Sequence, residues 1–450
     1  MTAPTRLGKP TSPRPKPFVR RPGPRLPVDA TPRQEPSGPG SGAGIGSGAG
    51  IGSGPGIARI SLGRVFHAES ANYVFLLGVT LFMVVFGLIM VLSSSSVDAH
   101  STSGSFFGQF LRQGMFAMVG VPLMLVASRV PSRFWKKWAW VLLAGACALQ
   151  LLVVFTPLGH GAFGNKNWLQ IGSLPALQPS EAIKVAMVVW MGMFFAKKWD
   201  RVREWRYALF PAVLVMGAAI GLVLLGNDLG TVIIMAGILL GCLFFAGVPL
   251  RQLTVVLLAG ALGAFLFTVT SSNRMGRILA LFSPDTAGAT DPWQMQNGMF
   301  ALASGGVFGV GLGNSHSKWN WLPSADTDFI FAIIGEELGL IGAVLVLALF
   351  VLLAVAFLRI LHSTADPAAR VTTAGVMVWL IGQGLVNIGV VLGVLPTLGV
   401  PLPLISSGGT ALISSLVAIG IVLSFARETG RDAPQPVSAV AARRASRRLS

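Results

Sequence analysis

Long uncharged apolar blocks dominate the sequence between about residues 70 and 426. A helix needs about 20 residues to cross the hydrocarbon core of a bilayer, so blocks of about 18 or more apolar residues predict membrane spans. Ten spans are predicted, at approximately residues 73–94, 108–128, 138–156, 180–196, 207–225, 229–247, 252–270, 329–358, 371–393 and 408–426. The pattern indicates an all-α, polytopic integral membrane protein.

The charges between the spans predict which side of the membrane each loop faces, because cytoplasmic loops carry an excess of Lys and Arg. With a cytoplasmic N-terminus, the basic inner segments are 129–137, 197–206, 248–251, 359–370 and the C-terminal tail. The outer segments carry only a few basic residues, namely Lys166, Arg274, Arg277 and Lys318. Moving one span would break this alternation. We therefore expect both termini to be cytoplasmic.

Composition supports the membrane class: 53% of the 450 residues are hydrophobic and 11% are charged, against roughly 25% charged in soluble domains. The net charge of +17 lies largely in the two tails. Residues 1–65 carry ten basic and two acidic residues (+8), and residues 427–450 carry six and two (+4). This distribution suits anionic lipid headgroups, and no nucleic-acid partner is expected. The Pro/Gly/Ser-rich segment 1–65 is predicted to be a disordered cytoplasmic tail, as it has no apolar signal-peptide core.

Two outer segments, 157–179 and 271–328, are too long to be simple connectors. The second has nearly sixty residues, no obvious regular structure and several apolar anchors, so it is predicted to fold onto the membrane face. The span that follows, from Phe329 to Leu358, would be about 45 Å long, more than the hydrocarbon thickness. Its first turns must then project into the outer interface, with Asp326 and Asp328 where apolar surface meets water.

Ionisable residues at membrane depth are expensive and therefore candidates for function. Glu181 and Lys184 lie three residues apart on one helix face, which fits either a local ion pair or a polar cavity wall. Asp228, in a tight Gly-Asn-Asp turn, fits a helix N-cap best. Asp326 or Asp328 could likewise cap the next helix. A carboxylate beside apolar surface binds protons more tightly, however, which suits a general base.

The same residues belong to a set of motifs that resembles the SEDS family (shape, elongation, division and sporulation), the FtsW/RodA membrane glycosyltransferases. The resemblance covers about residues 70–426 and is strongest to the cell-division branch. The matching motifs are 164–168, 178–181 with Lys184, 228–231, Arg277 before 282–284, 293–294, 304–315, 322–323 with 327–332, 336–339, Gln383, 387–389, 395–396, 401–406 and 408–409.

The resemblance implies a lipid II polymerase, a peptidoglycan glycosyltransferase of the cell membrane that works at the division septum. It implies a class B penicillin-binding protein and other divisome proteins as partners. The family's essential acid falls on Asp328, which would deprotonate the acceptor sugar. The positive charge that stabilises the pyrophosphate leaving group would come from Lys166, Arg274, Arg277 or Lys318, or from a divalent cation, Mg²⁺ or Mn²⁺. No covalently bound cofactor is expected. Further substrate contacts are expected from Trp168, Glu181, Lys184, Asp228, Gln294, Gln383, Asn387 and Ser406.

Four positions depart from the family pattern. Asp326 replaces the usual His two residues before the acid. If both carboxylates face the site, their repulsion would raise the pKa of one of them or invite a cation. The alternative, which we favour, is that Asp326 caps the following helix. The usual basic pair before Trp168 is reduced to Lys166 with Asn167, and Ser324 and Ser407 replace an acidic and an aromatic residue. Two other functions stay open: a flippase or transporter of the lipid-linked substrate, and a non-enzymatic scaffold that recruits a penicillin-binding protein.

Overall fold

A computed structural model of the chain describes residues 70–103, 108–161, 165–170, 172, 175–270, 274–277, 279, 291–317, 322 and 325–432. The tail at 1–65, residues 433–450 and Lys318 lie outside the described residues. Within the described part, ten helices are long and apolar enough to cross a membrane, so the predicted count is confirmed.

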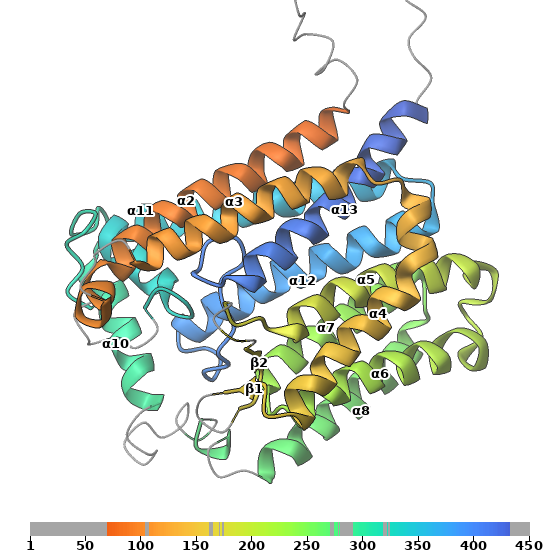
Figure 1. The fold of residues 1–450 in the computed structure, drawn as a ribbon, viewed down its shortest axis with the longest axis horizontal. Helices are drawn as coiled ribbons and strands as arrows, with labels where there is room; N and C mark the ends of the chain where they lie inside the picture. Colours follow the sequence, from red (N-terminus) through yellow and green to blue (C-terminus); the bar gives the residue numbers. More distant parts are fainter. Residues whose placement is uncertain are drawn as a thin grey trace, which may run out of the picture. The chain divides into compact units, whose positions relative to one another are not determined.

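The helices follow the predicted order along the chain (Figure 1). The ten spanning helices are α2 (Ala71–Ser103), α3 (Gly108–Arg129), α4 (Ser132–Phe155), α5 (Pro179–Lys197), α6 (Phe210–Leu225), α7 (Leu229–Ala246), α8 (Leu250–Val269), α11 (Ile330–Ser363), α12 (Pro367–Val391) and α13 (Thr410–Asp432). Two short turns, η1 (Trp199–Arg201) and η2 (Trp205–Leu209), precede α6. The strands β1 (Gly159–His160) and β2 (Trp168–Leu169) pair antiparallel in the 157–179 segment.

The 271–328 segment is more structured than the sequence suggested. It contains a further helix, α10 (Asp291–Ser304), which packs against α11. The prediction failed because α10 is short and its apolar residues are interrupted by polar ones such as Gln294, Gln296 and Asn297. Figure 1 shows α10 near the end of the bundle where α11 begins.

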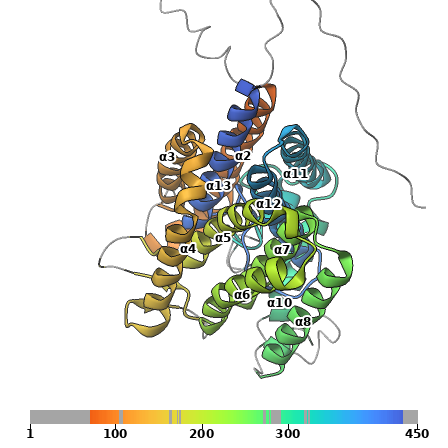
Figure 2. The same cartoon turned by 90° about the vertical axis from the view of Figure 1, so that its right-hand side faces the viewer.

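Helices α5, α12 and α13 form the interior of the bundle. In the apolar window of α5, 78% of the residues are buried, against 11% in α8. Helix α12 packs against α5, α7 and α11, and α13 packs along α3. Helix α8 packs chiefly on α7 and lies at the periphery in both views (Figure 1, Figure 2). Its apolar side chains therefore face the surroundings of the bundle.

The chain enters and leaves the bundle at the same end. The Ser70 hydroxyl, just before α2, donates to the carbonyl of Ala426 near the end of α13 at 3.1 Å. The opposite end of α13 begins at Thr410, and sixteen residues of helix separate it from Ala426, or about 24 Å. Anything that contacts Thr410 thus lies far from the point of entry.

Candidate active site

A cavity of about 670 Å³ lies at the end of the bundle away from Ser70. Residues of α3, α5, α7, α10 and α12, of the β1–β2 region and of the 397–411 loop line it. Nine of the predicted site residues line this cavity: Trp168, Glu181, Lys184, Asp228, Arg277, Gln294, Asp328, Gln383 and Asn387. Residues that are up to 219 positions apart in the sequence, Trp168 and Asn387, thus line one cavity.

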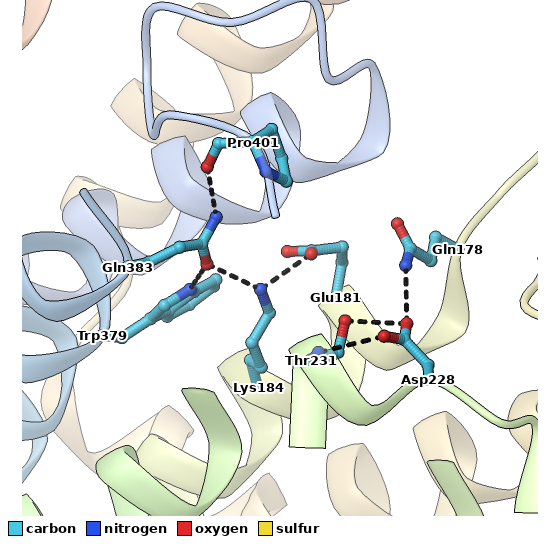
Figure 3. Close-up of polar contacts among 8 residues, drawn as sticks. All are labelled: Gln178, Glu181, Lys184, Asp228, Thr231, Trp379, Gln383 and Pro401. Carbon is cyan, nitrogen blue, oxygen red and sulfur yellow. Dashed lines mark hydrogen bonds and ion pairs between the residues drawn. The ribbon is translucent and has the colours of Figure 1, made fainter. Parts of the chain in front are cut away.

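Glu181 and Lys184 form an ion pair inside the cavity wall, with 2.7 Å between the carboxylate Oε1 and the ammonium Nζ (Figure 3). Both side chains are almost fully buried. Lys184 Nζ also donates to Gln383 Oε1 of α12 at 3.1 Å, and Trp379 Nε1 donates to the same oxygen at 3.0 Å. Both sequence interpretations hold: the two residues pair locally, and the pair is part of a polar cavity wall.

The other carboxylate oxygen of Glu181, Oε2, is not part of this ion pair. Glu181 Oε2 is buried and has no hydrogen-bond partner among the described residues. A buried carboxylate oxygen without a donor costs free energy, which a ligand that supplies an O–H or N–H would recover. The cavity wall therefore offers one strong acceptor to a bound molecule.

Asp228 caps α7, as the sequence predicted. Thr231 donates to its carboxylate twice, from the backbone N–H at 3.0 Å and from the hydroxyl at 2.8 Å. Gln178 Nε2 donates at 3.4 Å. The contacts drawn in Figure 3 place this cap beside the Glu181–Lys184 pair. Asp228 therefore contributes a fixed negative charge to the cavity.

Asp328 lies in the turn before α11, with a partly buried side chain that lines the cavity. The side chains of Asn387 and Ser406 hold the backbone of this turn. Asn387 Nδ2 donates to the Asp328 carbonyl at 2.7 Å and to the Val400 carbonyl at 2.8 Å. The Ser406 hydroxyl donates to the carbonyl of Thr327 at 2.6 Å. Ser406 itself does not line the cavity, so it positions the turn and is not placed to contact a substrate.

The surroundings of Asp328 raise the pKa of its carboxyl from 3.8 to about 6. Burial is the largest cause, and the negative charges of Asp326 and Asp228 add to it. The positive charge of Arg277 opposes the rise. A carboxylate with this pKa is ionised at neutral pH and still accepts a proton readily, which is what a general base requires.

Asp326 does not cap α11, so that expectation was wrong. Phe329 occupies the cap position and makes no side-chain cap hydrogen bond. The Asp326 side chain instead turns toward α3, where Gln109 Nε2 donates to its Oδ2 at 3.0 Å. Its backbone carbonyl accepts from the N–H of Ser407 at 2.9 Å. The residue thus joins three segments of the cavity wall.

Three of the four outer basic residues lie within the described part of the chain, and each makes different contacts. Arg277 lines the cavity and donates from Nη1 to the carbonyl of Thr397 at 3.5 Å. Lys166 does not line it: its ammonium donates to the carbonyls of Val154 and Thr156 at the end of α4. Arg274 is held by the Phe267 carbonyl and ring and by Asn227 Oδ1. Carbonyls at the ends of helices attract cations. Lys166 and Arg274 therefore bind such carbonyls and do not line the cavity, which could not be predicted from the sequence.

Sequence reasoning missed Arg112 of α3, which lines the cavity. An arginine within the predicted span 108–128 was a usable signal, because charges at membrane depth usually face a cavity. Among the described residues, no group of three or more His, Cys, Asp or Glu side chains is arranged to hold a metal ion.

Comparison with known proteins places the chain in a family. A family model described as cell cycle protein, covering FtsW, RodA and SpoVE, matches residues 73–431. The chain belongs to this family. It is 37% identical over 389 residues to the probable peptidoglycan glycosyltransferase FtsW of Mycobacterium tuberculosis (strain ATCC 25618 / H37Rv), covering 86% of this chain and 73% of the relative. It is 33% identical over 349 residues to the stage V sporulation protein E of Bacillus subtilis (strain 168), covering 78% and 95%.

Similar solved structures support the assignment of the chain to this family. One, described as showing the structural coordination of polymerization and crosslinking by a peptidoglycan synthase complex, has a TM-score of 0.64 at 26% identity, covering 79% of this chain and 98% of that one. The rod shape determining protein RodA of Thermus thermophilus has a TM-score of 0.59 at 26% identity, covering 81% and 98%. The predicted ten-helix SEDS fold is confirmed.

Proposed function

We propose that the chain is a peptidoglycan glycosyltransferase that polymerises lipid II into glycan strands during septal wall synthesis, with Asp328 as general base. The observation that carries the proposal is the cavity itself. It combines a carboxylate whose pKa is about 6 with the cationic side chains of Arg112 and Arg277. Family membership and relatives named peptidoglycan glycosyltransferase support the same activity.

In the proposed orientation both termini are cytoplasmic and the cavity faces outward. Basic loop residues support it. Lys136 at the start of α4 pairs with Asp366 at the start of α12, and Arg359 lies over the ring of Phe75 near the start of α2. These residues share the end of the bundle where Ser70 enters. Since positive loops favour the cytoplasm, the cavity at the other end opens toward the outside.

The reaction we propose is an inverting transfer. The Asp328 carboxylate accepts the proton of the acceptor sugar hydroxyl while that oxygen attacks the anomeric carbon of the donor. The new glycosidic bond forms as the bond from that carbon to the polyprenyl pyrophosphate breaks, and the pyrophosphate leaves with the electron pair. Arg277 and Arg112 are placed to offset its charge. The proton stays on Asp328 until water removes it.

A divalent cation would be a second source of positive charge if the cavity carboxylates were arranged to hold one. Asp228 is engaged by Thr231 and Gln178, and Glu181 is engaged by Lys184. Among the described residues, no group of three or more His, Cys, Asp or Glu side chains could hold a metal ion. These residues do not fit a protein-held cation, so no step is assigned to Mg²⁺ or Mn²⁺.

For partners, we propose a class B penicillin-binding protein, which would crosslink the strands, and further divisome proteins. The support is the similarity to a chain from a peptidoglycan synthase complex that coordinates polymerization and crosslinking. Several relatives carry the name FtsW, which supports the septum as the place of action.

The test is polymerisation of labelled lipid II by the purified chain with its transpeptidase partner, comparing the wild type with Asp328→Ala. General-base removal should lower the polymerisation rate by about 10²- to 10⁴-fold. Asp200→Ala changes an exposed acid at the other end of the bundle and should polymerise normally. Equal polymer from wild type and Asp328→Ala would refute the proposed mechanism.

The same variants separate the rival functions. A flippase would move lipid II across proteoliposomes at the wild-type rate in Asp328→Ala, with no polymer from either protein. A scaffold would support growth of cells that carry only Asp328→Ala. The polymerase proposal predicts neither result.

A further inference from the structure

The segment that follows α10, residues 304–313, is a glycine-rich loop with outward apolar side chains. From Met299 to Gly313 the sequence carries no charged residue. The exposed fractions are 81% for Phe308, 56% for Leu312 and 54% for Val307. A Phe so exposed in water is unfavourable, by about 25 cal/mol for each Å² of apolar surface. An apolar environment around this surface would recover that free energy.

The loop is packed backbone to backbone on α11 at a kink. Gly339 interrupts α11 with a φ of 67°, and a Cβ there would meet the Gly309 nitrogen at 2.4 Å. The N–H of Leu340 donates to the carbonyl of Gly306, and that of Ile341 donates to Val307. This contact fixes the backbone of the loop against α11.

Several backbone donors in the second half of the loop are satisfied within the protein. The N–H groups of Gly309, Val310 and Gly311 donate to the carbonyls of Gly305, Glu336 and Glu337, at 2.8 to 3.0 Å. The N–H of Gly313 donates to the Ser93 hydroxyl of α2 at 3.0 Å. Such pairing suits irregular backbone beside hydrocarbon, where no water is present to accept from it.

Two acidic side chains of the described residues, Glu336 and Glu337, lie beside the loop, and they are 1% and 0% exposed. The Glu336 carboxylate accepts from the Ser315 hydroxyl at 2.6 Å and from the N–H of His316 at 2.8 Å. The Glu337 carboxylate accepts from the Ser93 hydroxyl. Both acids are therefore directed inward, away from the side that carries Phe308.

The lengths of α11 and α2 indicate how far the loop lies from the opposite membrane boundary. From Arg359 to Leu340, α11 rises through nineteen residues, or about 29 Å. From Ala71 to Ser93, α2 rises about 33 Å. Both distances match the roughly 30 Å hydrocarbon core. The loop touches Leu340 and Ser93 and so lies at the far boundary of the core, where aromatic side chains are enriched.

We propose that residues 304–313 form a lipid-binding platform that inserts Phe308 and Leu312 into the leaflet at the cavity end of the bundle. Continuity of surface identifies lipid as the occupant. The platform adjoins Leu340, Ile341 and Val344 of α11, which are 57%, 55% and 52% exposed on a helix that spans the membrane. This interaction does not depend on the proposed transferase activity.

The test is spin-label accessibility in proteoliposomes of phosphatidylethanolamine and phosphatidylglycerol. Cys147→Ala and Cys242→Ala remove the native thiols, and single labels are attached through Phe308→Cys or Leu312→Cys. Val351→Cys, on the exposed face of α11 at 61% exposure, is the lipid control. Gln170→Cys, exposed on the cavity wall, is the water control. The protein without an introduced cysteine reports background labelling.

Lipid insertion predicts that oxygen relaxes the labels at 308 and 312 more than a water-soluble nickel complex does, as at 351. A larger effect of the nickel complex, as at 170, would overturn the proposal. Shielding from both relaxants would also overturn it, because the platform would then be covered by protein. Two labels keep the test decisive if one substitution disturbs the loop, and the label at 351 verifies that the chain is folded.

Discussion

Asp326→Asn is the most informative single substitution near the proposed base. It removes one negative charge beside Asp328 but keeps a side-chain oxygen that can accept from Gln109 Nε2, the hydrogen bond of 3.0 Å seen in the wild type. The other charges that act on Asp328, those of Asp228 and Arg277, stay in place. The change is therefore electrostatic more than structural.

The size of the effect follows from the causes of the raised pKa. The pKa of Asp328 rises from 3.8 to about 6, with burial as the largest cause and Asp326 next. Removing the Asp326 charge therefore lowers the pKa of Asp328, while burial keeps that pKa above its ordinary value. At pH 5 a carboxyl with a pKa of about 6 is only about one-tenth ionised, so a lower pKa raises the ionised fraction. Relative activity at pH 5 should rise in the variant, by less than the roughly tenfold that complete ionisation would give.

The assay is the initial rate of lipid II polymerisation between pH 4.5 and 8, with kcat/KM plotted against pH, because its acid limb reports the pKa of the free enzyme. The midpoint of that limb should move to lower pH in Asp326→Asn. Asp200→Asn, an exposed acid on η1, should leave it in place. An unchanged midpoint, or one that moves to higher pH, would refute the electrostatic role of Asp326.

Three further predictions concern the cavity and the platform. Glu181→Gln leaves the buried Lys184 ammonium without its counterion, so thermal unfolding in detergent should show a loss of about 3–5 kcal/mol, partly restored by adding Lys184→Met; no restoration would argue against the pair. Gly339→Ala should destabilise the protein by about 1–3 kcal/mol because of its positive φ and the nearby Gly309 nitrogen, whereas Gly217→Ala, where the added Cβ meets open space, should be neutral in the same measurement. Arg277→Gln removes the charge that lowers the pKa of Asp328, so the acid limb should move to higher pH; a move to lower pH would contradict this.

The spans were predictable because a bilayer demands long apolar helices, whatever their neighbours. The sixth predicted span, 229–247, nearly coincides with Leu229–Ala246. The third, 138–156, missed the first turns of Ser132–Phe155 because Arg133, Lys136 and Lys137 look like loop residues. These side chains lie at the helix start, and Lys136 pairs with Asp366 across the bundle. Hydropathy alone cannot separate a charged loop from a charged helix end.

Local contacts at the site were also predictable. The spacing of Glu181 and Lys184 indicated their ion pair, and the turn before Leu229 indicated the Asp228 cap. Contacts between distant segments were not. Gln109 lies 217 positions from Asp326, and Gln383 lies 199 positions from Lys184. Nothing near Asp326 in the sequence shows that α3 supplies a donor, so the helix cap was the simpler and wrong expectation.

The central claim is that Asp328, and not its neighbour, is the general base. The most direct measurement is the length and amount of glycan polymer made from labelled lipid II by two matched variants with the partner transpeptidase, Asp328→Asn and Asp326→Asn. Each replaces one carboxylate by an amide of the same shape. The account predicts polymer from Asp326→Asn and almost none from Asp328→Asn. Comparable polymer from Asp328→Asn would contradict it.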